Sequence, residues 1–147
     1  MRQQTINDSQ LAVQQTRELV KRFFAEIWNM GRLESIPQLC STNLHYTSGS
    51  SRPEREGHDG LARMVQTIRT SLDNYHSEVI SMVVEENKAF VKVRFSGKHV
   101  GFLMGYEPTG RQVEWVGGME FTVRNGQILH VWELGDTMTL CEQLERG

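Results

Sequence analysis

Residues 97–136 constrain the fold of this chain more than any other part of it. Two segments of alternating apolar and polar side chains flank Asn125-Gly126, a pair of residues that strongly indicates a tight β-hairpin. A segment punctuated by glycine and proline, residues 99–111, precedes the hairpin. A long antiparallel ribbon of this kind buries one face only, so it needs a covering layer. Helices that close a curved sheet into a cone would supply that layer, and the hollow inside is a natural site for a small molecule.

The N-terminal half of the chain predicts two helices that each bury one face. Apolar residues recur at spacings of three and four from a cap at Asp8 or Ser9 to about Met30, and again from about residue 59 to residue 72. Residues 1–7 are polar, and we expect them to form a frayed tail.

The remaining elements complete an α+β domain. We expect a short helix, three further strands and a terminal helix at about 33–39, 43–48, 75–85, 89–99 and 137–144. The order is then ααβαβββ followed by a terminal turn of helix, with the helices on one face of the sheet. The irregular stretch 48–58 has no apolar residue except proline, and we expect a mobile loop there, near the mouth of the cavity.

Composition excludes several classes of function. A chain of 147 residues suits one domain with a hydrophobic core, and a net charge of −2 without a Lys/Arg run argues against a nucleic-acid partner. We see no long apolar stretch and no signal peptide, so we expect no membrane partner and a cytoplasmic location. Cys40 and Cys141 are isolated and are interpreted as small buried hydrophobes, and the spacing of His and Cys predicts no metal site.

A run of matched motifs gives a resemblance to a known family. Residues 97–111 read GKHVGFLMGYEPTGR, and Asn-Gly-Gln-Ile at 125–128, Asp136 and a Leu- and Gln-containing tail at 140–144 follow in order. This arrangement resembles the SnoaL-like polyketide cyclases (ester cyclases), a branch of the NTF2-like superfamily, and FFAEIWNMG at 23–31 is similar to the end of their first helix. The resemblance implies one domain over residues 1–147: an NTF2-like cone in which N-terminal helices pack on the concave face of a curved antiparallel sheet.

The resemblance also implies a chemistry, which is ring closure by an intramolecular aldol reaction without metal or organic cofactor. A carboxylate must remove a proton next to a carbonyl, and a donor must hold the enolate oxygen. An apolar cavity solvates a carboxylate poorly and so raises its pKa toward working pH. Matching the motif from Asn125-Gly126 carries the family's catalytic Asp onto Glu133, its catalytic His onto Met119 and an Asn of its first strand onto Tyr46. The chain thus keeps an acid, and Tyr46 could replace a donor.

The direction of Glu133 depends on the geometry of the hairpin. A two-residue turn at Asn125-Gly126 with regular strands points His130 inward and Glu133 outward, whereas a longer loop or a bulge after Ile128 reverses both. An inward His130 is either a second acid/base candidate or a histidine at the edge of the core. Asp136 either lines the pocket or caps the terminal helix.

The candidate pocket is large and mostly apolar. Its expected lining residues are Trp28, Tyr46, His99, Phe102, Met104, Trp115, Met119, Phe121 and Trp132. The three tryptophans are alternatively plain core residues, and His99 alternatively bonds a neighbouring backbone group. Arg111 is interpreted as a surface arginine.

Three functional hypotheses remain open. The first is a cofactor-free cyclase or isomerase that uses Glu133 on a hydrophobic, carbonyl-bearing small molecule. The second is a dehydratase or an epoxide-hydrolase-like enzyme on the same fold, with His130 or Asp136 as its acid or base. The third is a non-catalytic protein that binds a small molecule or dimerises.

The outer face of the sheet predicts self-association. Its side chains in the strand before the hairpin are Glu114, Glu120, Thr122 and Arg124. We expect a homodimer with a fairly polar interface.

Overall fold

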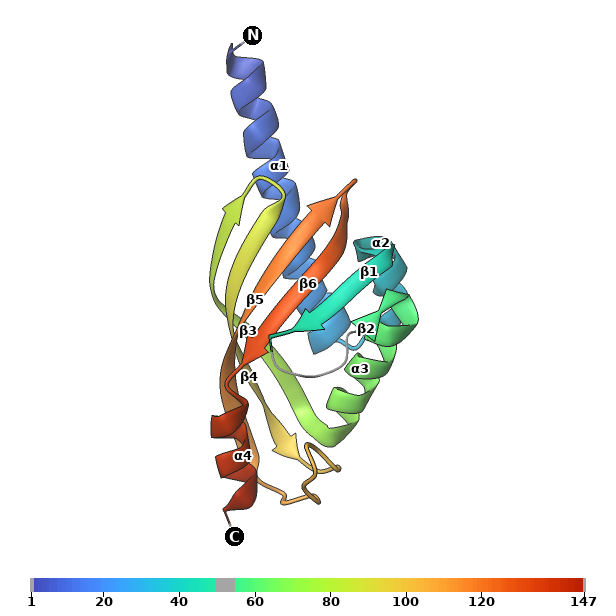
Figure 1. The fold of residues 1–147 in the computed structure, drawn as a ribbon, viewed down its shortest axis with the longest axis vertical. Coiled ribbons are helices and arrows are strands. Elements are labelled where there is room, and N and C mark those ends of the chain that lie inside the picture. Colours follow the sequence, from blue (N-terminus) through green and yellow to red (C-terminus); the bar gives the residue numbers. More distant parts are fainter. Residues whose placement is uncertain (1, 50–54, 147) are drawn as a thin grey trace.

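A curved sheet with helices across one face makes up the fold (Figure 1). The structure is a computed structural model that describes residues 2–49 and 55–146. Its elements are α1 (Arg2–Arg22), the π-helix η1 (Phe23–Asn29), the 3-10 helix η2 (Leu33–Ser35), α2 (Ile36–Leu39), β1 (Cys40–Ser48), β2 (Arg55–Glu56), α3 (Gly57–Ser71), β3 (Leu72–Glu85), β4 (Lys88–His99), β5 (Gln112–Arg124), β6 (Gln127–Gly135) and α4 (Thr137–Glu145). Residues 50–54 of the expected mobile loop lie outside the described residues.

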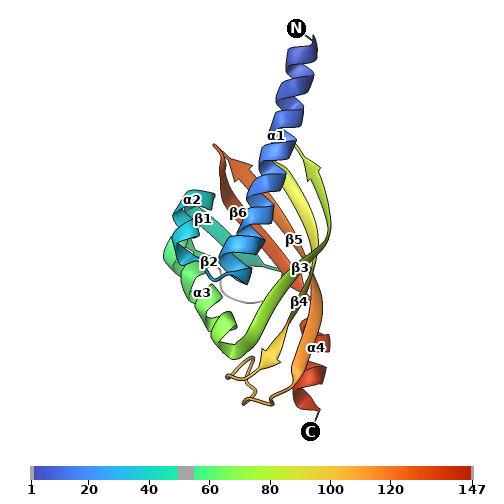
Figure 2. The same ribbon diagram turned by 180° about the vertical axis from the view of Figure 1, so that it is seen from behind.

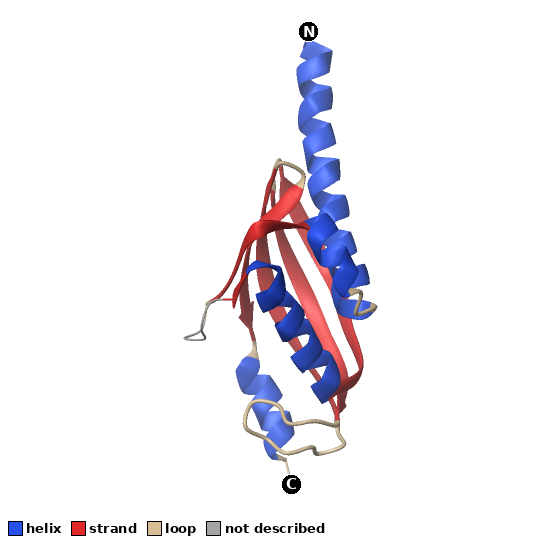
Figure 3. Cartoon of the chain, turned by 90° about the vertical axis from the view of Figure 1, so that its right-hand side faces the viewer, coloured by secondary structure: helices blue, strands red, loops and turns tan. Residues whose placement is uncertain are grey.

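The sheet is mostly antiparallel, with one parallel pair. Its strand order is β2-β1-β6-β5-β4-β3. Strands β3 to β6 form an antiparallel meander, whereas β1 runs parallel to β6. The curved antiparallel sheet expected from the sequence is present, and the parallel pairing of β1 with β6 is the exception in it, because the segment from β2 through α3 carries the chain to the far edge of the sheet. Figures 2 and 3 show α1 and α3 lying across the same face.

The first helix begins at Arg2, earlier than the expected cap at Asp8 or Ser9. The segment 2–22 contains no glycine or proline that would interrupt a helix. Its N-terminal part extends past the end of the sheet (Figure 1), and Val20 is its first fully buried apolar residue among the described side chains. The frayed tail expected at residues 1–7 is thus helical from Arg2.

The end of this first helix widens into the π-helix η1. Met30 N–H donates to the carbonyl of Ala25, five residues back, which is the π-helical pattern. The wider turn buries four large side chains: Phe23, Phe24, Ile27 and Trp28. The rings of Phe23 and Phe24 meet Phe121 of β5 edge to face, with centroids 5.2 and 5.7 Å away. This aromatic cluster fixes the end of the helix on the sheet.

A β-bulge follows the hairpin and decides which side chains of β6 face inward. Asn125 and Gly126 both have positive φ, as a two-residue type I′ turn requires. The register then shifts, because Val123 pairs with Ile128 while Thr122 pairs with His130. Leu129 is the additional residue, and beyond it the alternation of β6 is reversed.

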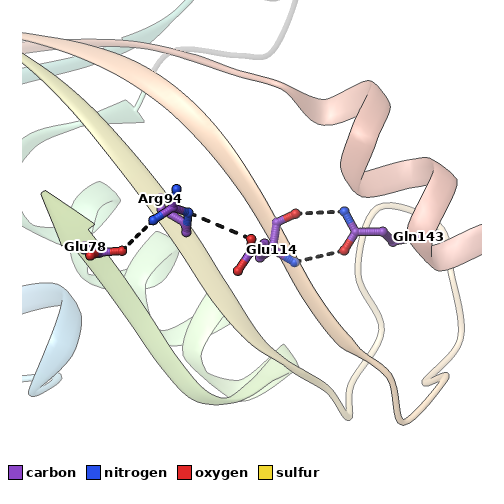
Figure 4. A network of polar contacts seen from close by, with 4 residues as sticks. All are labelled: Glu78, Arg94, Glu114 and Gln143. Atoms are coloured by element: carbon purple, nitrogen blue, oxygen red, sulfur yellow. Dashed lines mark hydrogen bonds and ion pairs between the residues drawn. The ribbon is translucent and has the colours of Figure 1, made fainter. Parts of the chain in front are cut away.

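The terminal helix α4 is attached by polar contacts to the edge of β5 beyond its pairing with β6 (Figure 4). The side chain of Gln143 accepts from Glu114 N–H at 2.9 Å and donates to the Glu114 carbonyl at 2.7 Å. Arg94 lies between Glu114 and Glu78, at 3.8 and 2.8 Å, and so links three strands on the outer face.

Candidate active site

A cavity of about 140 Å³ lies between the inner face of the sheet and the helices η1 and α3. Its walls are mostly apolar and include Phe24, Trp28, Met64, Ile68, Phe95, Leu103, Met104, Trp115, Met119 and Leu140. An apolar cavity of about 150 Å³ binds benzene in another protein, so this one suits a ligand of about one aromatic ring. Its polar lining side chains include Tyr46 and Ser48 on β1, Tyr75 on β3, Glu133 on β6 and Thr137 on α4.

Glu133 and Tyr46 form a hydrogen-bonded pair in this cavity. Tyr46 of β1 and Glu133 of β6 both line it, and the phenol oxygen of Tyr46 lies 2.9 Å from Oε1 of Glu133. The parallel register puts Ser48, another lining residue, beside Glu133. Glu133 faces inward because of the bulge at Leu129, so it lies opposite Met119 of β5.

Burial fixes the protonation state of the phenol in this pair. Desolvation, and then the negative charge of Glu133, raise the pKa of Tyr46 well above its ordinary value of 10.0. Tyr46 therefore stays protonated at working pH and donates its hydrogen bond to the carboxylate. The pair is a carboxylate whose orientation is fixed by a neutral donor.

A second polar group faces the cavity from β3. The hydroxyl of Tyr75, a lining residue, lies 2.5 Å from Oγ of Ser77, and burial raises the pKa of Tyr75. The side chain of Asn29 bonds both the N–H and the carbonyl of Ser77, at 2.7 and 3.0 Å. These bonds join the end of η1 to the strand that carries Tyr75.

Arg69 of α3 anchors the same helix end. Its guanidinium donates to the carbonyls of Trp28 and Asn29 at 2.6 and 2.9 Å. Carbonyls at a helix C-terminus lack partners within the helix, and Arg69 supplies them here. Gly31 leaves room for it, since a Cβ there would lie 2.7 Å from Nε of Arg69. The cavity wall at Trp28 is thus held by three elements.

Two of the three candidate acid/base residues lie away from the cavity. His130 faces the outer side of the sheet, where its Nε2 lies 2.9 Å from the hydroxyl of Thr47. The bulge that turns Glu133 inward turns His130 outward. Asp136 caps α4, accepting from the N–H of Thr139 at 3.1 Å and from its hydroxyl at 2.6 Å, and these bonds lower the pKa of Asp136.

Four of the nine expected lining residues lie elsewhere. Trp132 shares the outer face with His130 because the same bulge reverses its direction. Phe102 is 62% exposed, and Phe121 belongs to the aromatic cluster behind the cavity. His99 is buried, but its Nδ1 accepts from the N–H of Thr109 at 3.1 Å, so it supports the loop 100–111. The other five, Trp28, Tyr46, Met104, Trp115 and Met119, line the cavity.

Sequence reasoning did not identify Tyr75 as a lining residue. Two irregularities in the pairing of β3 with β4, at 73–76 and 79–81, break the alternation that would have revealed its direction. Its polar partner Ser77 gave no signal either, because a single serine in a strand is common.

The described residues offer few other ligand groups. Among them, no three His, Cys, Asp or Glu side chains lie together in a way that could hold a metal ion. No helix in the described part of the chain is both long and apolar enough to cross a membrane.

An α+β cone with a mostly apolar cavity, in which Glu133 is the acid among the described lining residues, is typical of small-molecule-binding folds. The sequence profile of the SnoaL-like polyketide cyclases matches residues 18–144. The chain belongs to this family. None of the curated proteins compared with it matches the sequence.

Solved structures share the fold at low sequence identity. A SnoaL-like protein from Jannaschia sp. CCS1 has a TM-score of 0.83 and 20% identity, over 91% of this chain and 94% of its own. TsrD from Streptomyces laurentii has a TM-score of 0.78 and 21% identity, over 89% and 95%. A SnoaL-like polyketide cyclase from Agrobacterium tumefaciens strain C58 has a TM-score of 0.75 and 16% identity, over 88% and 97%. At these identities the likeness establishes the fold alone.

Proposed function

We propose that the protein is a cofactor-free enzyme of the cyclase or isomerase type, with Glu133 as the base that acts on a hydrophobic, carbonyl-bearing small molecule. The observation that carries the proposal is the carboxylate of Glu133 in an apolar cavity, bonded by the neutral phenol of Tyr46. A carboxylate in such surroundings has few competing waters and a fixed orientation, which favours proton abstraction from carbon.

The reaction begins when Glu133 takes a proton from the carbon next to the carbonyl. The electron pair of the C–H bond forms a carbon–carbon double bond, and the π pair of the carbonyl moves onto oxygen to give an enolate. In an isomerisation, the substrate also carries a double bond beyond the α-carbon, so the enolate is a dienolate; the protonated Glu133 returns the proton to its γ-carbon, and the carbonyl re-forms in conjugation with the shifted double bond. In a cyclisation, the enolate carbon attacks a second carbonyl of the same molecule, and the new alkoxide takes the proton from Glu133. Both routes leave the enzyme unchanged and need no oxidant or reductant.

The positions of His130 and Asp136 weaken the alternative of a dehydratase or an epoxide hydrolase. Both reactions need an acid that protonates a departing or opening oxygen. His130 bonds Thr47 on the outer face and Asp136 caps α4, so neither supplies that acid in the cavity.

Deuterium exchange tests the proposal without knowledge of the natural substrate. A hydrophobic ketone with one aromatic ring, such as phenylacetone, is incubated with the protein in D₂O, and deuterium at the carbon next to the carbonyl is followed by NMR. Glu133→Gln should slow enzyme-catalysed exchange by at least about a hundredfold, since general-base catalysis contributes that much. Glu120→Gln is the matched control, because Glu120 lies on the outer face beside Lys88. Exchange that survives Glu133→Gln would refute the assigned base, and a ketone that binds without exchange would favour the non-catalytic reading.

A homodimer through the outer face of the sheet remains part of the proposal. Val83 and Phe90 pair across β3 and β4 on that face and are 71% and 47% exposed, and Leu134 of β6 is exposed too. Exposed apolar side chains on the same face as the polar network of Glu78, Arg94 and Glu114 favour a self-complementary contact. Light scattering that gives a mass near 16.9 kDa at all concentrations would exclude it. The cytoplasmic location expected from the sequence stays a prediction.

A further inference from the structure

The hydroxyls of Tyr75 and Ser77 carry one more proton than the fold uses. Each hydroxyl has a single proton, and the one hydrogen bond between the two oxygens, which lie 2.5 Å apart, uses only one of the two protons. Within the described part of the chain, neither hydroxyl has a second acceptor. One O–H group is therefore left without a partner in the protein, which is uncommon for a buried polar group.

The cavity decides which of the two protons is left over. Ser77 is 3% exposed and does not line the cavity, so an unused proton on Ser77 would have no acceptor at all. Tyr75 is 8% exposed and does line the cavity, where the oxygen of a ligand can accept from it. The favoured arrangement is thus a bond from Ser77 to the phenol oxygen, which leaves the O–H of Tyr75 available to the cavity.

The surroundings of Tyr75 keep its phenol in place. The side chain of Asn29 bonds the backbone of Ser77 on both sides, at 2.7 and 3.0 Å, and so fixes the residue that holds the phenol oxygen. The ring of Trp28 lies against that of Tyr75, with centroids 5.6 Å apart. A donor that is fixed before the ligand binds loses little entropy on binding, which is what stabilisation of a developing charge requires.

The phenol of Tyr75 lies within the electrostatic reach of Glu133. Burial raises the pKa of Tyr75, the hydrogen bond with Ser77 partly offsets that rise, and the negative charge of Glu133 adds to it. The phenol therefore keeps its proton at working pH, while a bond received from Ser77 makes it a stronger donor. Such a donor stabilises an oxygen that gains negative charge, as the oxygen of a ketone does when an enolate forms.

Tyr46 is not available for the same task. Its single phenol proton already goes to Oε1 of Glu133. Tyr75 lies on β3 and Glu133 on β6, with β4 and β5 between them in the sheet. The base and the free donor thus belong to different parts of the cavity wall, and a substrate between them can present its C–H to one and its oxygen to the other.

We propose that the phenol O–H of Tyr75, with Ser77 bonded to its oxygen, binds the carbonyl oxygen of the substrate and stabilises the enolate that Glu133 generates. This assignment rests on the proposed function and orients the substrate, whose carbonyl points toward β3. As Glu133 takes the proton from carbon, the C–H pair forms the double bond and the π pair of the carbonyl moves onto the oxygen held by Tyr75. The proton of Tyr75 stays on the phenol throughout.

Pentafluorophenolate serves as a stable stand-in for the enolate, because it has one ring and carries its negative charge on oxygen at neutral pH. The reference protein is Glu133→Gln, which lacks the carboxylate that would repel an anion. Pentafluorotoluene is the matched ligand without the oxygen, and the binding of both is followed by fluorine NMR. Two variants are made in the reference protein. Tyr75→Phe removes the donor and keeps the ring, whereas Ser77→Ala removes the other hydroxyl and keeps the donor.

Tyr75→Phe should lower the affinity for the phenolate at least about tenfold and leave that for pentafluorotoluene unchanged, because only the phenolate loses a hydrogen bond to a charged group. Ser77→Ala should weaken phenolate binding less, since Tyr75 keeps its O–H. A phenol with a purely structural role would affect the two ligands alike. Equal losses for both ligands, equal losses of phenolate affinity in both variants, or no binding of the phenolate to the reference protein would overturn the assignment.

A second measurement keeps the native Tyr75. The chain has three tyrosines, and a carbon-13 label at the ζ carbon of each reports on its hydroxyl. In the Glu133→Gln protein, the signal of Tyr75 should move when the phenolate binds. The signal of Tyr106, which bonds Glu145 and does not line the cavity, should stay in place. An unmoved Tyr75 signal would also overturn the assignment. None of these outcomes bears on Glu133, which the ketone exchange tests separately.

Discussion

Removal of the phenol of Tyr46 should make the protein less sensitive to alkaline pH. Tyr46 is buried, and its pKa lies well above the value of 10.0 that it has when the chain unfolds. The folded protein therefore holds a proton that the unfolded chain releases above pH 10. A raised folded pKa contributes stability that is fully present below the unfolded pKa and is lost as pH rises above it.

The magnitude follows from proton linkage. Between pH 9 and pH 11, an unfolded tyrosine with a pKa of about 10 goes from mostly protonated to mostly ionised, and one buried tyrosine that stays protonated then costs the folded state about 1.4 kcal/mol. Tyr75 adds a similar amount because burial raises its pKa as well. Burial raises the pKa of Cys40 to about 12, from 9.0, so Cys40 adds a loss of the same sign over this range. The sum is a large part of the stability of a typical domain.

Urea unfolding at pH 9 and at pH 11 measures the effect. The wild type and Tyr46→Phe are compared, and the quantity of interest is the stability that each loses between the two pH values. Tyr46→Phe should lose about 1.4 kcal/mol less than the wild type, whatever its stability at pH 9. Tyr75→Phe should show the same reduction. Equal losses in Tyr46→Phe and the wild type would refute the conclusion that the folded protein keeps this phenol protonated.

Three further predictions concern the packing of the fold. Gly117→Ala adds a Cβ 2.9 Å from the ring of Phe95 and should lower the free energy of unfolding, measured in urea, by about 1–3 kcal/mol. An unchanged free energy of unfolding would mean that the strand or the ring of Phe95 moves to accommodate the methyl group. Arg69→Met removes two charge-assisted hydrogen bonds to the end of η1 and should lower the free energy of unfolding by about 2 kcal/mol or more. An unchanged midpoint of thermal unfolding would contradict this prediction. Ellman's reagent at pH 8 should label the half-buried Cys141 first and Cys40 only on unfolding, because burial raises the pKa of Cys40 to about 12; rapid labelling of both would contradict this.

The strands and the hairpin could be predicted from the sequence because they follow from local patterns. Alternation in residues 112–124 and the Asn125-Gly126 turn depend on the immediate neighbours of each residue, and the structure has both. The match of residues 18–144 to the family confirms the resemblance read from the same motifs.

The direction of the side chains of β6 could not be predicted. One additional residue, Leu129, exchanges the inward and outward faces beyond it, and regular and bulged hairpins fit the local sequence equally well. The positions of Glu133, His130 and Trp132 all depend on that one residue. The parallel pairing of β1 with β6 could not be predicted from the sequence either, because it joins segments that are far apart in the chain and carry no local signal for it.

The donors of the cavity come from a different part of the fold than the family motif suggests. The motif's histidine falls on Met119, whose thioether cannot donate a hydrogen bond, and Met119 lies directly across from Glu133. The donors present instead are the phenols of Tyr46 on β1 and Tyr75 on β3. Tyr46 already donates to Glu133, so a donor restored on β5 should give the enolate oxygen a further contact.

Ketone exchange tests the effect of a restored donor. Met119→His should speed exchange in the wild type, since a histidine there would offer a donor to the enolate oxygen. The same substitution should leave Glu133→Gln inactive, because no donor replaces the base. Exchange that recovers in the double variant would show that the histidine itself acts as a base, and the separation of base from donor would then be wrong.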